Sequence, residues 1–151
     1  MKNPKYRRIE LRPNPKPIEN QQLQFYRALE LAWLQGGWTE YIDELFYLGT
    51  KLKLAEEIDT HLTQGRDPKK LTVVCGMQRP VSVTRFAIAE SAHVISFALE
   101  GRDIRTLAES APLLAAHVKD LDYSSHEFAW FNRHTKTVWR GNAQDLFAEA
   151  A

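Results

Sequence analysis

Aromatic and cationic side chains alternate in HEFAWFNRHTKTVWRG, near the carboxyl end of the chain. Aromatic rings stack on nucleobases or fill pockets of a protein partner, and cations neutralise phosphate. Residues 123–151 contain three basic residues, counting Lys and Arg together, and three acidic ones. The segment therefore has no net positive charge to attract phosphate. We therefore expect a protein partner, with nucleic acid as the alternative and core packing as the plainer explanation. The partner-binding candidates are Phe128, Trp130, Phe131, Arg133, Lys136, Trp139 and Arg140.

A second candidate site lies at the end of the apolar run LTVVCG. It consists of Cys75 and Arg79, which are separated in the sequence by Gly76, Met77 and Gln78. A cysteine at the end of a buried strand beside a cation can hold a thiolate in an anion-binding loop. This order resembles the loops of cysteine phosphatases and rhodanese-like sulfurtransferases, but those families hold more residues between Cys and Arg. We therefore interpret Cys75 as a buried, unreactive thiol and keep a small enzyme using it as an alternative.

Metal-binding and cofactor-binding patterns are not found in the sequence. The histidines show no i, i+4 pair and Cys75 is the single cysteine, so we expect no metal site and no cofactor. There is no G-x-G-x-x-G, Walker or G-x-S-x-G motif. We interpret the acidic residues of the first half of the chain as the solvated face of a long helix: Glu40, Asp43, Glu44, Glu56, Glu57 and Asp59. By elimination, we expect a non-catalytic protein-protein interaction or assembly protein.

The first half of the chain is predicted to be a basic lead segment followed by helices. Residues 1–16 carry a net charge of +5 against −5 for residues 17–64, and they read as an edge strand and a proline-rich connector. The nucleic-acid alternative would combine this segment with the aromatic one. Apolar residues at helical spacing predict helices over 18–35 and 39–64, separated by Gly36 and Gly37. The result is an antiparallel helical hairpin over 18–65.

The second half, residues 70–151, is predicted to be mixed α/β. Residues 71–76 read as a buried strand, and a possible second strand extends to about 86 before a helix over 88–100. Asp103 and Pro112 mark the beginnings of further short helices. Two aromatic and β-branched runs, 126–131 and 136–140, predict a β-hairpin, and Asn142 caps a short terminal helix.

Composition places these elements in one α+β domain spanning residues 1–151. Apolar residues make up 44% of the chain, enough for a core without disulfides. We expect an antiparallel helical hairpin and further helices packed on a small, mainly antiparallel sheet with a C-terminal β-hairpin. The single cysteine favours the cytoplasm, and no apolar run is long enough to span a membrane. The oligomeric state does not follow from the sequence.

Overall fold

The computed structural model describes residues 9–148 and divides the chain into two compact units, Met1–Gln78 and Arg79–Ala151. Helices and strands occur in both units, so the predicted mixed α+β class is confirmed. The first unit contains α1 (Ile18–Gln35), β1 (Thr39–Ile42), the π-helix η1 (Tyr47–Lys51), α2 (Ala55–Gln64) and β2 (Thr72–Cys75). The second contains the short 3-10 helix η2 (Pro80–Ser82), α3 (Phe86–Ala89), β3 (His93–Phe97), α4 (Gly101–Ser110), α5 (Pro112–Val118), β4 (Glu127–Asn132), β5 (Thr137–Asn142) and α6 (Ala143–Ala148).

The first unit is built around the parallel pair β1 and β2, in which Thr39 lies opposite Thr72 and Ile42 opposite Cys75. Side chains alternate between the two faces of such a pair. Tyr41 and Val74 lie opposite each other on the exposed face, whereas the face of Glu40 and Ile42 is turned towards the helices. The buried apolar core of this unit consists of Leu29, Ile42, Leu45, Leu52, Leu54, Ile58 and Leu71.

The predicted helix over 18–35 is confirmed as α1, but the second helix of the predicted hairpin is wrong. Residues 39–42 form a strand, and helix begins only in the segment that follows, with Lys53 in the left-handed region between η1 and α2. The apolar residues of the segment fit a helical period and a strand equally well. Pairing with β2, far along the chain, decides the outcome, because tertiary contacts override local pattern in strands.

Gly36 is required where the chain leaves α1 and enters β1. Its φ is 64°, and a Cβ atom there would lie 2.5 Å from the carbonyl oxygen of Lys69. The neighbouring Gly37 has a similar φ of 71° with open space around it, and its N–H donates to that same Lys69 oxygen. The pair therefore fixes the beginning of β1 beside the segment that leads into β2.

Replacing Gly36 with alanine should lower the free energy of unfolding by about 3 kcal/mol, because the left-handed backbone and the backbone clash add. The matched change Gly37→Ala should cost only about 1 kcal/mol, since it adds the backbone penalty alone. Urea denaturation of the two variants measures both values. Equal losses would mean that the approach of Gly36 to Lys69 does not matter.

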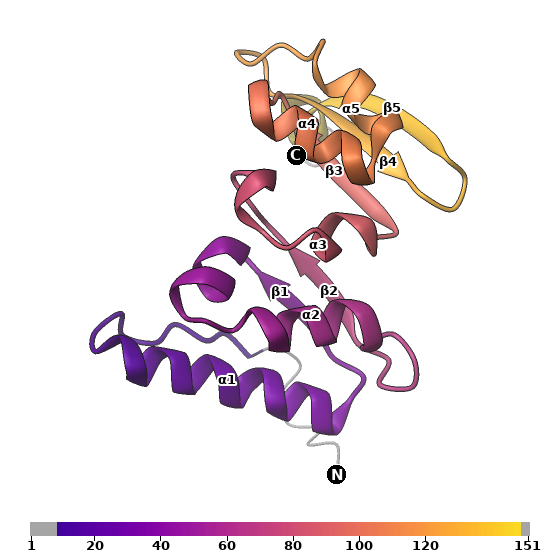
Figure 1. The fold of residues 1–151 in the computed structure, drawn as a ribbon. Helices are drawn as coiled ribbons and strands as arrows, with labels where there is room; N and C mark the ends of the chain where they lie inside the picture. The colour runs from indigo at the N-terminus through magenta and orange to yellow at the C-terminus, as the bar shows by residue number, and fades with distance from the viewer. Residues whose placement is uncertain (1–8, 149–151) are drawn as a thin grey trace. The chain divides into compact units, whose positions relative to one another are not determined.

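The second unit contains an antiparallel sheet in the order β3-β4-β5, with α5 packed against all three strands and α4 against α5 (Figure 1). The predicted C-terminal β-hairpin is confirmed as β4 and β5. The predicted cap is confirmed as well, because the side-chain oxygen of Asn142 accepts the backbone N–H of Gln144 at 2.9 Å. The buried core of this unit consists of Ala87, Ile88, Leu107, Ala111, Leu114, Ala115, Val118, Leu121, Ala129 and Phe131.

The prediction of a strand to about 86 followed by a helix over 88–100 is wrong. Residues 86–89 form one helical turn, and residues 93–97 form β3, which pairs with β4. A short run that is apolar almost all round cannot distinguish a buried helix from a strand, so periodicity was an insufficient guide. Pro112 does begin a helix, as expected, but Asp103 lies within the first turn of α4 and not before it.

The edge strand predicted within residues 1–16 falls partly outside the described residues, and residues 9–11 have no regular structure. Within residues 9–148, no helix is both long and apolar enough to cross a membrane.

Candidate functional site

The carboxyl ends of β1 and β2 lie side by side because the two strands are parallel and in register. Asp43 and Glu44 follow β1, and Gly76, Met77 and Gln78 follow β2. The two connecting segments are joined by backbone hydrogen bonds, from Gly76 N–H to Ile42 C=O at 2.8 Å and from Leu45 N–H to Gly76 C=O at 3.0 Å. In α/β sheets, ligands bind at this edge, outside the carboxyl ends of the strands.

Gly76 permits the close approach of these two segments. A Cβ atom at this position would lie 2.5 Å from the backbone oxygen of Asp43. Any other residue would therefore push the segment carrying Gln78 away from the one carrying Asp43 and Glu44. The glycine brings an acidic pair and an amide to the same edge of the sheet.

The side chains at this edge differ in their access to solvent. Asp43 and Gln78 are exposed and Glu44 is half-buried, while the Tyr41 hydroxyl donates to Asp43 Oδ1 at 3.4 Å. An exposed carboxylate can ligate a hard divalent cation, and a neighbouring carboxylate can accept a proton from water. An exposed amide can donate hydrogen bonds to an anion or orient a water molecule.

The sequence-based interpretation of Asp43 and Glu44 as part of a solvated helix face is wrong, because they follow a strand. The signal that could have identified them is the order of residue types. Tyr41 and Ile42 favour a strand, and an acidic pair follows them directly. A helical interpretation of residues 39–64 hid this order.

A buried polar pair holds β1 against α2 behind this edge. Nδ1 of His61 lies 3.0 Å and 2.9 Å from the two carboxylate oxygens of Glu40, and the two side chains are only 5% and 10% exposed. The His61 ring also packs on Trp33 of α1, with ring centroids 5.4 Å apart. This contact fixes the position of β1 through both of its covering helices.

Cys75 and Arg79, the two residues of the alternative in which the chain is a small enzyme, have different surroundings. Cys75 is half-buried at the end of β2, on the face of Ile42, and burial raises the pKa of its thiol. The Arg79 guanidinium donates from Nε and Nη2 to Asp103 Oδ2, both at 3.1 Å. Asp103 also accepts the N–H of Val81, so it holds the beginning of η2 against α4.

Cys75 should react slowly with thiol reagents at neutral pH, because the raised pKa leaves less thiolate than an exposed cysteine has. The reaction should accelerate as pH rises through that pKa, and it should become fast in denaturant. Labelling of the native chain as fast as that of the unfolded chain at neutral pH would contradict the prediction.

The aromatic candidates of the C-terminal hairpin lie on two different faces of the sheet. Phe128, Trp130 and Trp139 share one face, because Trp130 lies opposite Trp139 and Phe128 opposite Gly141. Phe131 lies on the other face and is buried, with Ala129 beside it. The aromatic set predicted from the sequence is therefore not one surface.

The cationic candidates are also separated. Arg133 donates to the backbone oxygens of Ser91, Ile88 and Ser110, so it ties β4 to the segments around α3 and α4. Lys136 is exposed in the hairpin turn with a φ of 56°. Arg140 lies at the opposite end of the hairpin, in the network described next.

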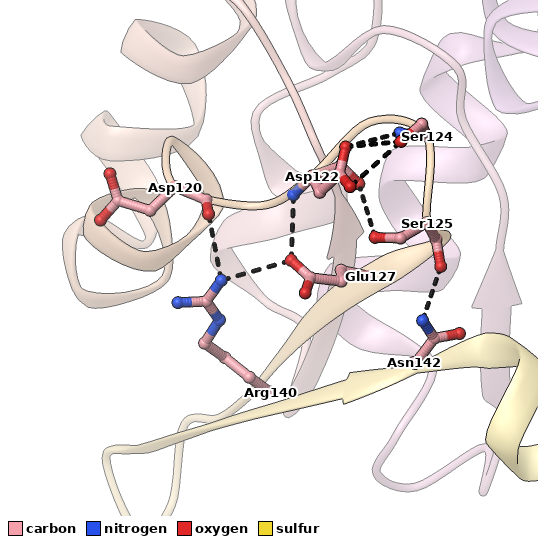
Figure 2. A network of polar contacts seen from close by, with 7 residues as sticks. All are labelled: Asp120, Asp122, Ser124, Ser125, Glu127, Arg140 and Asn142. Atoms are coloured by element: carbon pink, nitrogen blue, oxygen red, sulfur yellow. Dashed lines mark hydrogen bonds and ion pairs between the residues drawn. The ribbon is translucent and has the colours of Figure 1, made fainter.

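Figure 2 shows this network where the chain enters β4. Arg140 donates to the backbone oxygen of Asp120 at 3.0 Å and contacts Glu127, whose carboxylate accepts the N–H of Asp122. The Asp122 carboxylate accepts both the N–H and the hydroxyl of Ser124, and these bonds lower its pKa. The network orders a connecting loop, and it accounts for Arg140 without a ligand.

No protein-family model matches the chain, and no curated protein matches it. Solved structures do share its fold. The genome packaging NTPase B204 of Sulfolobus turreted icosahedral virus 2, in complex with AMPPCP, matches at 20% identity with a TM-score of 0.63, covering 81% of this chain and 60% of that one. The same NTPase in complex with sulfate matches at 18% identity with a TM-score of 0.64, covering 86% of this chain and 64% of that one. A further structure of B204, described as the DNA-packaging ATPase from Sulfolobus turreted icosahedral virus, matches at 17% identity with a TM-score of 0.61. The match covers 87% of this chain and 63% of that one.

At such identities the likeness establishes the fold alone, and the chain spans less than two thirds of the length of these proteins. The likeness nevertheless overturns the expectation of a non-catalytic interaction or assembly protein, because the solved fold that the chain shares is that of an NTPase. The sequence-based elimination interpreted Asp43 and Glu44 as part of a solvated helix face.

Proposed function

We propose that this chain binds a nucleoside triphosphate with Mg²⁺ at the carboxyl ends of β1 and β2 and takes part in its hydrolysis. The observation that carries the proposal is the acidic pair Asp43 and Glu44 at the end of β1, beside the segment that follows β2. The fold likeness supports it, since the similar B204 was solved in complexes with AMPPCP and with sulfate.

Asp43 fits the requirements of a Mg²⁺ ligand. Mg²⁺ is commonly held by one or two carboxylates together with substrate phosphates, and P-loop NTPases hold it with an Asp and a Ser or Thr of the phosphate-binding loop. The Asp43 carboxylate is exposed and follows the carboxyl end of β1, where an ion brought in with the nucleotide could reach it. When bound, the ion neutralises charge on the phosphoryl oxygens.

Glu44 and Gln78 have the chemistry for the hydrolytic step. The oxygen of a water molecule attacks the terminal phosphorus, the bond from that phosphorus to the bridging oxygen breaks, and the water proton passes to the Glu44 carboxylate. The Gln78 amide donates a hydrogen bond to a phosphoryl oxygen or to this water. The half-buried position of Glu44 limits its rotamers and so favours a fixed orientation.

The 151 residues contain no G-x-x-x-x-G-K-[ST] loop, which in P-loop NTPases surrounds the phosphates with backbone N–H groups. We therefore expect weak binding by this chain, dominated by the metal ion, and experiments should use millimolar nucleotide. Because the metal ion dominates this binding, its removal with EDTA should abolish binding of the nucleotide.

Asp43→Asn should abolish stabilisation of the protein by Mg²⁺ and ATP. For the unchanged chain, ligand at ten times its Kd adds about 1.4 kcal/mol to the free energy of unfolding, which raises Tm by roughly 3–6 °C. Thermal unfolding followed by circular dichroism measures the shift. The control Glu56→Gln, an exposed carboxylate on α2, should keep the full shift. No shift in the unchanged chain, or the same shift in Asp43→Asn, would contradict the proposal.

Nucleic acid is the partner class that we propose for any work driven by this hydrolysis. The support is limited to the printed descriptions of the similar proteins as genome packaging and DNA-packaging enzymes. Addition of double-stranded DNA should stimulate hydrolysis by this chain, and it should do so less at high salt because phosphate contacts release counterions. An unchanged rate with DNA would remove this part of the proposal.

A further inference from the structure

The helix α1 carries exposed leucines on the side that faces away from the core of the first unit. Its inner side holds the buried residues Gln21 and Leu29, and the helix packs on α2. Leu23 and Leu34 lie about half a turn round the helix from this inner side, and they are 46% and 69% exposed. Figure 1 shows the other labelled elements of the first unit, α2, β1 and β2, on one side of α1 only. The outer side is therefore accessible to a partner.

Two residues of opposite charge lie between these leucines. Leu23, Arg27, Glu30 and Leu34 follow one another at spacings of four, three and four residues, which places all four within roughly 40–60° of arc on the helix surface. We call these four residues the outer stripe. Alternating spacings of three and four are those of the contact positions of a coiled coil. Arg27 and Glu30 are exposed, and neither has an ion-pair partner within the described part of the chain.

The outer stripe is complementary to its own reverse. If a second copy of α1 runs antiparallel to the first, with the twofold axis midway between Arg27 and Glu30, Leu23 lies opposite Leu34 of the second copy. In the same arrangement Arg27 lies opposite Glu30 of the second copy. Symmetry repeats both contacts, so the two helices make two leucine pairs and two ion pairs. A parallel arrangement in register would instead place Arg27 against Arg27 and Glu30 against Glu30.

We infer that the outer stripe of α1 is a contact between two copies of this chain, with the two helices antiparallel and Arg27 of each copy paired with Glu30 of the other. The leucine pairs bury apolar surface at both ends of the contact, and the ion pairs select the direction and register of the helices. The charges of the stripe cancel, so it has no net positive charge to attract nucleic acid. The inference does not rest on the proposed nucleotide site, because the stripe includes none of its residues.

Sedimentation velocity of the full chain, from micromolar to millimolar concentration, tests the inference. The unchanged chain should show a monomer-dimer equilibrium, and a weak one because a single helix from each copy makes a small contact. Leu34→Ala should weaken dimerisation by about 30-fold, since the side chain is lost at both ends of a twofold contact. Because Leu34 is largely exposed in the single chain, the dilute variant should unfold at nearly the same temperature. The matched control Leu113→Ala removes an exposed leucine from α5 and should leave dimerisation unchanged.

The pairing of Arg27 with Glu30 is tested by exchanging their charges. Arg27→Glu and Glu30→Arg should each weaken the dimer by about 10-fold, since repulsion replaces a weak surface ion pair at two places. The double variant keeps the net charge of the chain and should restore the dimer, because opposite charges again face each other. A chain that stays monomeric at its highest soluble concentration, a dimer insensitive to Leu34→Ala, or a double variant no stronger than the single ones would overturn the inference. So would a loss in Leu113→Ala as large as that in Leu34→Ala.

Discussion

Glu44→Gln should lower the turnover of ATP by about 10²–10⁴-fold, the usual contribution of a positioned general base. The amide keeps the size of the side chain but cannot accept the proton of the attacking water. Binding of Mg²⁺ and ATP should be nearly unchanged, because the change leaves Asp43 in place. Steady-state release of phosphate measures turnover, and the shift of Tm with nucleotide measures binding in the same samples.

The exposed carboxylate of Glu56 on α2 again provides a matched control, since Glu56→Gln changes the same chemical group away from the sheet edge. Its turnover should equal that of the unchanged chain. If Glu44→Gln hydrolyses ATP at the full rate, the assignment of Glu44 as the base is wrong, even if Asp43→Asn abolishes binding.

His61→Ala should lower the free energy of unfolding by about 3 kcal/mol, because it leaves a buried carboxyl group without its hydrogen-bond partner. The change leaves the Glu40 carboxylate, only 10% exposed, without the ring nitrogen that contacts both of its oxygens. It also removes the ring that packs on Trp33. Denaturation in urea, followed by Trp fluorescence, gives the free energy.

The exposed Gln64 at the end of the same helix offers a control, because Gln64→Ala keeps helical propensity and removes no buried contact. Its stability should lie within about 0.5 kcal/mol of the unchanged chain. A similarly small loss in His61→Ala would show that the buried pair contributes little to holding β1 against the helices.

Local signals in the sequence were sufficient for the elements whose contacts are local. α1 ends where Gly36 and Gly37 permit left-handed backbone, and the β4-β5 hairpin joins neighbours along the chain. The short strands β1 and β3 were missed because each pairs with a segment far away. Residues 39–42 make only about one turn of a helix, which is too short for a period to decide. The strand that they form needs β2 as its partner.

The candidate site was missed for the same reason. Asp43 and Glu44 are candidate site residues because they follow the carboxyl end of a parallel strand. A local sequence pattern does not reveal which strand will pair with it in parallel. The hairpin follows from local pattern, and so does the division of its aromatic residues between two faces. The alternation along β4 separates Trp130 from Phe131, and only the packing of α5 decides which of the two is covered.

Paramagnetic broadening by Mn²⁺, which like Mg²⁺ prefers oxygen ligands, tests the location of the nucleotide site most directly. With ATP present, Mn²⁺ should broaden the backbone amide resonances of Asp43, Glu44, Gly76 and Gln78, while the amides of the β4-β5 hairpin stay sharp. Asp43→Asn should remove the effect. Broadening centred on other residues, or equal broadening in Asp43→Asn, would contradict the proposal that these two strand ends hold the metal and its nucleotide.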